Sequence, residues 1–103
     1  MSKRLEMLEK LVASGAADSF GVYALAMELR KLGEVDRAVA TFESLRQRDA
    51  RYVPMYLMAA QTLADASRPA EARSWVEQGI AEARAQGEAK ALGELEALLA
   101  VLG

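Results

Sequence analysis

The chain has 103 residues, of which 52% are hydrophobic and 27% are charged, and its formal net charge is -2 at pH 7. This composition is typical of one globular domain and not of a disordered or fibrous chain. The small negative charge gives no electrostatic reason to bind nucleic acid or an anionic membrane. Cysteine and histidine are both absent. Their absence excludes disulfides, thiolate or imidazole metal ligands, and catalysis by a thiol or an imidazole.

The sequence shows no sign of membrane insertion or secretion. Residues 97–102 form as long an apolar stretch as any, which is far too short to cross a bilayer. Residues 1–6 carry a charge every few positions and lack the apolar core of a signal peptide. We therefore expect a cytoplasmic protein with no membrane partner.

Helix formers and helix-ending residues alternate along the chain and predict six helices. The first covers residues 4–13, where Leu5, Leu8, Leu11 and Val12 recur at helical spacing. Asp18 can cap a second helix over residues 19–32, and Gly33 can end it in a left-handed conformation. A third helix is expected over residues 35–48.

Two prolines mark where the next helices begin. Pro54 suits the first turn of a helix that ends near Ala66, and Pro69 opens another that continues to about Ala85. Gly87 ends that helix, and residues 88–102 form the last. No segment alternates apolar and polar residues over the length of a strand. We therefore predict an all-α fold of about six antiparallel helices.

A repeat of 34 residues relates the middle helices to one another. In the first helix of each hairpin, Val22, Leu25, Ala26 and Leu29 fall on Tyr56, Ala59, Ala60 and Leu63. In the loop and second helix, Gly33, Ala38 and Phe42 fall on Ser67, Ala72 and Val76, and further back Leu8 and Leu11 fall on Phe42 and Leu45. The small residues lie where paired helices approach within about 8–10 Å. A single hairpin cannot bury the bulky residues beside them, so we expect the hairpins to stack and their ends to be capped.

This pattern resembles tetratricopeptide repeats. That family repeats a bulky residue, two others, Leu-Gly, two others and an aromatic, followed by Ala and an aromatic residue four positions later. The string Val22-x-x-Leu25-Ala26-x-x-Leu29 with Ala38-x-x-x-Phe42 resembles this pattern, and the string that starts at Tyr56 fits more loosely. Ala50 stands where the family has a closing proline.

The resemblance implies a right-handed stack of helix hairpins in a single domain, similar to small bacterial repeat proteins. Its parts are a leading helix (1–16), two hairpins (17–50 and 51–86) and a capping helix (87–103). In such a stack the first helix of each hairpin lines the concave side. The residues implied there are Phe20, Tyr23, Met27, Arg30, Leu57, Met58 and Gln61. They either form an apolar groove for a partner peptide or helix, or are covered by the terminal helices. Some repeats in this family bind a terminal carboxylate with Lys, Asn and Arg, but the matching positions here are Tyr23, Met27, Leu57 and Met58, which cannot form such a clamp.

The last helix carries two neighbouring apolar stripes. The first consists of Leu92, Leu95, Leu99 and Leu102, and the second, weaker one of Ala91, Glu94, Leu98 and Val101. One stripe is needed to close the stack, and the other faces water or a second chain. We expect a monomer that dimerises weakly.

Neither catalysis nor cofactor binding is predicted. The sequence has no catalytic Ser-His or Cys-His arrangement, no phosphate-binding glycine loop and no cluster of metal ligands. Arg46, Arg48 and Arg51 lie close together, but Asp49 lies among them and cations suit a helix end. The sequence therefore predicts a non-catalytic module for protein–protein interaction, without metal, cofactor or nucleic acid. The alternative is a structural homo-oligomer that assembles through the C-terminal helix or the inner face.

The repeat register predicts which alanines tolerate enlargement. Ala38→Leu and Ala72→Leu should each lower the free energy of unfolding by about 1–3 kcal/mol, because a larger side chain forces paired helices apart. Ala13→Leu, outside the hairpins, should have a much smaller effect. Urea unfolding of the three variants measures this, and equal effects at all three positions would show that the register is wrong.

Overall fold

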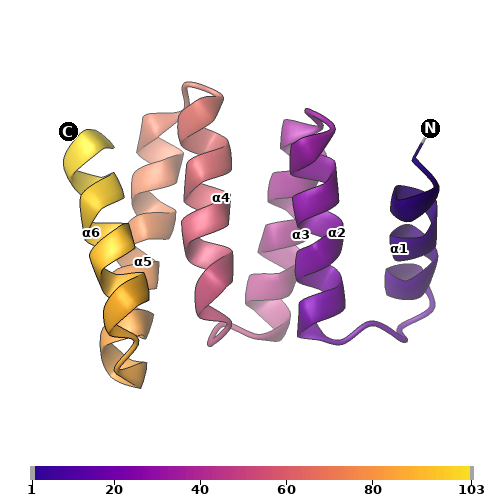
Figure 1. Cartoon of the computed structure of the whole chain (residues 1–103), viewed down its shortest axis with the longest axis horizontal. Coiled ribbons are helices and arrows are strands. Elements are labelled where there is room, and N and C mark those ends of the chain that lie inside the picture. Colours follow the sequence, from indigo (N-terminus) through magenta and orange to yellow (C-terminus); the bar gives the residue numbers. More distant parts are fainter. Residues whose placement is uncertain (1, 103) are drawn as a thin grey trace. The chain divides into compact units, whose positions relative to one another are not determined.

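The computed structural model describes residues 2–102, which form six α-helices and no strand (Figure 1). In chain order the helices are α1 (Lys3–Ala13), α2 (Ser19–Lys31), α3 (Val35–Arg48), α4 (Val53–Asp65), α5 (Pro69–Gln86) and α6 (Ala89–Leu102). Every predicted helix is present, and the all-α prediction is confirmed. Within the described residues, none of these helices has the length and apolar character needed to cross a membrane.

The chain divides into two compact units between Ala50 and Arg51. In unit 1, α2 packs against both α1 and α3. In unit 2, α5 packs against α4 and α6, and α6 also contacts α4. The division falls at the predicted boundary between the two hairpins. The expected single domain, with its four parts, stays a prediction.

The residues that end the helices take the conformations expected of them. The side chain of Asp18 caps α2 by accepting a hydrogen bond from the Gly21 amide at 2.8 Å. Gly33 and Gly87 end α2 and α5 with φ values of +78° and +69°, in the left-handed region that glycine adopts without strain. Ser67, one repeat after Gly33, also has a positive φ of 62°. The 34-residue repeat therefore extends to the backbone of the turns.

Small residues lie fully buried within each hairpin. Ala26 and Ala38 in unit 1, like Ala60 and Ala72 in unit 2, are 0% exposed. In each hairpin an aromatic pair also joins the two helices. The ring centroids lie 6.3 Å apart for Tyr23 and Phe42, and 6.1 Å apart for Tyr56 and Trp75. The remaining bulky residues of the repeat are buried around these contacts: Val22, Leu25, Leu29, Leu45, Leu63 and Val76.

Gly79 of α5 lies at a close contact between helices in unit 2. A Cβ atom at this position would lie 2.5 Å from the Tyr56 Cβ and 3.1 Å from a methyl group of Leu95. The missing side chain therefore allows α5 to approach both α4 and α6. The repeat pattern does not reveal this residue, because Gly79 falls on Leu45 and breaks the pattern.

Two helical glycines should respond in opposite directions to substitution by alanine. Gly79→Ala should destabilise the protein by about 1–3 kcal/mol, because the new methyl group collides with Tyr56. Gly93→Ala in α6 meets nothing within 4 Å and should stabilise it by about 0.5–1 kcal/mol through helix propensity. Urea midpoints of both variants test this, and two stabilised variants would contradict the packing of α5.

Candidate functional site

The stripe predicted on α2 lines an open hollow in unit 1. Phe20, Tyr23, Met27 and Arg30 lie around this hollow together with Arg4 of α1. Phe20 is 66% exposed, whereas the other three stripe residues are half-buried. Part of the Tyr23 ring is occupied by its contact with Phe42. Phe20 and Met27 therefore offer apolar surface along this hollow.

An ion pair closes one side of this hollow. The side chain of Glu28 is 8% exposed, and its Oε1 lies 3.3 Å from the Nε of Arg4. The Ser2 hydroxyl donates a hydrogen bond of 3.4 Å to the other carboxylate oxygen. Because both partners come from the segment at α1, this carboxylate fastens α1 to α2. Lys31 adds a further cation to the rim.

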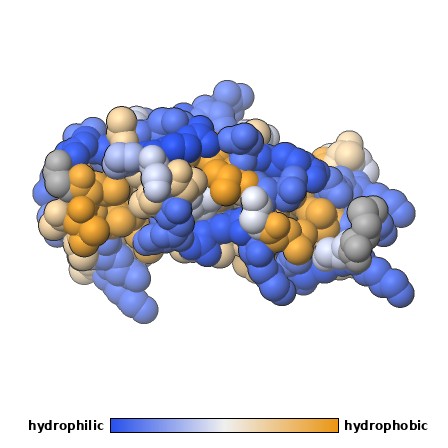
Figure 2. Space-filling view, turned by 90° about the horizontal axis from the view of Figure 1, so that it is seen from above, coloured by the Kyte–Doolittle hydropathy of each residue, from blue (hydrophilic) through white to orange (hydrophobic). Residues whose placement is uncertain are grey.

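The stripe predicted on α4 lines a second hollow, in unit 2. Leu57, Met58 and Gln61 are half-buried and face residues of α6. The wall that α6 provides consists of Glu94, Ala97, Leu98 and Val101. Val101 is 82% exposed, and Figure 2 shows apolar surface at the left of the view, where α6 lies in Figure 1. The terminal helix thus forms a side wall of this hollow and leaves the α4 stripe partly exposed.

The seven predicted groove residues therefore form two sets, one in each unit. The structure brings together the four residues of α2, and separately the three residues of α4. The position of these sets relative to one another stays a prediction.

The two stripes of α6 have different roles in unit 2. Leu95 is fully buried and its methyl groups lie beside Gly79 of α5, while Leu92, Leu99 and Leu102 are half-buried. This stripe is therefore the one that packs within the chain. The neighbouring stripe, which the sequence ranks as weaker, carries the most exposed of the large apolar residues described, Val101.

Charged side chains outside the two hollows were candidates for metal or nucleic-acid binding. In residues 2–102, acidic residues form no cluster of three or more that could hold a metal ion. Arg46 pairs with Glu43 on its own helix, and Arg51 lies 3.9 Å from Glu82. Two of the three clustered arginines thus contact carboxylates.

Sequence reasoning missed the ion pair of Glu28. The signal is present, because Glu28 follows Leu25 by three residues and precedes Leu29, which places it at a core-facing spacing. A charged residue at such a spacing needs a partner when buried. Arg4 provides it, but which helix supplies a partner depends on tertiary packing.

These features define a class of protein. Two helix hairpins related by 34 residues, with small residues in the helix contacts and a half-exposed apolar stripe on the first helix, form a helix-hairpin repeat protein.

Comparison with solved structures identifies the family. A solution structure of a tetratricopeptide repeat domain protein from Salinibacter ruber is 35% identical, covers 82% of this chain and 86% of that chain, and has a TM-score of 0.77. A crystal structure of a tetratricopeptide repeat domain protein from the same organism is 35% identical, covers 84% and 96%, and has a TM-score of 0.76. This chain belongs to the tetratricopeptide repeat family.

A third structure is similar in fold alone. It is a solution structure of a protein from Bordetella parapertussis, 24% identical, which covers 99% of this chain and 89% of that chain with a TM-score of 0.84. No family model matches the chain, and no curated protein matches it either.

Removing the exposed cation that pairs with the buried carboxylate of Glu28 should destabilise unit 1. Arg4→Ala leaves the Glu28 carboxylate without its cation and should lower the free energy of unfolding by about 1–3 kcal/mol. The matched control is Arg37→Ala, because the Arg37–Glu9 pair is exposed on both sides and such pairs contribute about 0–1 kcal/mol. Urea unfolding compares the two, and an effect of Arg4→Ala no larger than that of the control would contradict this role.

Proposed function

We propose that this protein is a non-catalytic interaction module that binds partner polypeptides through the apolar stripes of α2 and α4. One observation carries the proposal. The first helix of each hairpin buries one side in its unit and keeps a second apolar side half-exposed along an open hollow. Core packing accounts for the first side alone. Exposed apolar surface along a hollow is typical of protein interaction sites.

The residues of the two hollows indicate the chemistry of a partner. Phe20 and Met27 offer apolar contact beside the cations Arg30 and Lys31, whereas Leu57 and Met58 lie near Glu94. Methionine adapts its shape to varied apolar side chains. An amphipathic segment with apolar side chains at helical spacing suits such surfaces.

The same proposal includes a cytoplasmic location and the absence of nucleic-acid and membrane partners. The net charge of -2 supports it. The alternative is a structural homo-oligomer. Leu95 cannot contribute to contact between copies in such an oligomer, because this leucine is buried within unit 2.

Selection from a displayed library of random amphipathic peptides tests the proposal. Peptides enriched on the wild-type protein should bind Phe20→Ala or Met58→Ala about tenfold more weakly, because each substitution removes a large apolar contact of about 1.5–3 kcal/mol. Leu32→Ala is the control, since Leu32 is an exposed apolar residue, at 45%, outside both hollows. Circular dichroism would verify that each variant is folded.

Two results would contradict the proposal. The first is that the selection enriches no peptide on the wild-type protein. The other is peptide binding that Leu32→Ala weakens as much as Phe20→Ala and Met58→Ala do.

A further inference from the structure

The two residues of an exposed ion pair in unit 1 each have an equivalent residue elsewhere in the repeat, one on α1 and the other on α5. Glu9 of α1 pairs with Arg37 of α3 and ties these two helices together. In the 34-residue register, Arg37 corresponds to Lys3, and Glu9 corresponds to Glu77 two periods later. Lys3 on α1 and Glu77 on α5 are both exposed. Unit 1 thus exposes a cation, Lys3, and unit 2 exposes a carboxylate, Glu77. These two residues are the equivalents of Arg37 and Glu9, which form an ion pair within unit 1.

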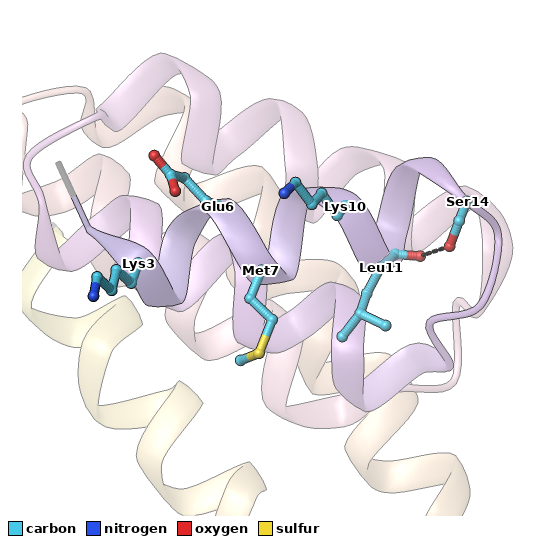
Figure 3. Close-up of a pocket in the computed structure, with 6 residues that line it drawn as sticks. All are labelled: Lys3, Glu6, Met7, Lys10, Leu11 and Ser14. Carbon is cyan, nitrogen blue, oxygen red and sulfur yellow. Dashed lines mark hydrogen bonds between the residues drawn. The ribbon is translucent and has the colours of Figure 1, made fainter.

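Around Lys3, the exposed side of α1 is partly apolar. Figure 3 shows Lys3, Met7 and Leu11 along one side of the helix, with Glu6 and Lys10 on another. Met7 is 53% exposed and Leu11 is 42% exposed. Leu45, which corresponds to Leu11 in the repeat, is fully buried. Leu11 therefore has the equivalent of a buried contact residue of α3 but is itself left uncovered, with the exposed Met7 beside it.

Around Glu77, α5 and α6 form an open hollow of complementary character. Its apolar residues are Ile80, Leu99 and Ala100, and its charged residues are Glu77, Arg84 and Glu96. Two carboxylates and one guanidinium leave a net negative charge here. The α1 surface has two lysines and one glutamate, which leave a net positive charge. Surfaces of opposite charge attract and orient one another.

The register of α6 matches this hollow to the contact of α2 with α3. Aligning the first residues of α2 and α6 places Leu92, Leu95 and Leu99 on Val22, Leu25 and Leu29, and Glu96 on Ala26. On the incoming helix, Arg4 of α1 corresponds to Ala38 of α3. In unit 1 the equivalent positions are the buried Ala26 and Ala38. A helix docked on α6 in the same way would bring Arg4 near Glu96, which has the opposite charge.

We propose that α1 of one molecule docks on the α5–α6 hollow of a second copy, in the position that α3 takes against α1 and α2. Copies then associate head to tail. Arg4 and Glu96 are larger than the alanines they replace and already pair with Glu28 and Arg84. The helices therefore stay further apart than within a hairpin, and the association is weak and sensitive to salt.

A head-to-tail contact leaves one docking surface free at each end of the assembly. Such heterologous contacts extend into longer assemblies unless the rotation closes a ring. The mass therefore grows with protein concentration beyond that of a dimer, unlike a two-fold contact between two α6 helices. The stripes of α2 and α4 take no part, so this inference stands or falls independently of the proposed function.

Charge reversal on the full chain tests the proposal by sedimentation velocity over a dilution series at low salt. Lys3→Glu and Glu77→Lys should each weaken self-association about tenfold or more, because each places like charges in contact. An equimolar mixture of the two variants should associate as the wild type does, since every contact then joins opposite charges. High salt should dissociate the wild-type assemblies.

The matched controls are Lys90→Glu and Glu88→Lys, which reverse exposed charges outside both surfaces. They should associate as the wild type does. The proposal is overturned by a wild-type protein that stays monomeric at all concentrations in low salt. It is equally overturned by a dimer that does not grow further, or by a mixture of the two reversed variants that fails to associate.

Discussion

The close approach of paired helices at small residues is the contact on which the rest of the structure depends. Ala26 and Ala38 in unit 1, and Ala60 and Ala72 in unit 2, are fully buried, so the helix axes can approach within about 8–10 Å. At that distance the larger neighbours reach across the hairpin, and each pair of helices gains an aromatic contact. Gly79 extends the same principle to three helices at once.

The helix ends and the hairpins could be predicted from the sequence, because nearby or regularly repeated residues determine them. Contacts that depend on how the helices pack could not be predicted. The helix ends follow from nearby residues such as Asp18 and Gly33, and the hairpins follow from the repeated small residues. The salt bridge of Glu28 and the contact of Gly79 depend on which helix packs on which side. For the site, the sequence predicted the stripes of α2 and α4 but left open whether the terminal helices cover them, because the side on which α6 packs depends on tertiary contacts.

The same packing also determines which surfaces remain for function. The first helix of each hairpin packs on its neighbouring helix with one side only. Its second side stays half-exposed and forms the stripes along the two hollows. The repeat also means that each end presents residues whose equivalents are in contact elsewhere in the chain, as Lys3 and Glu77 show. The proposed binding of a partner uses the stripes of α2 and α4, and the proposed contact between copies uses α1, α5 and α6.

The most direct measurement of the hairpin packing is by nuclear Overhauser effects between aromatic ring protons in solution. The chain has one Trp, three Tyr and two Phe, so only a few aromatic spin systems need to be assigned. The structure predicts cross-peaks between the rings of Tyr23 and Phe42 and between those of Tyr56 and Trp75. Absence of either set in a folded sample, or cross-peaks from Trp75 to Tyr52 in place of Tyr56, would contradict the hairpin register.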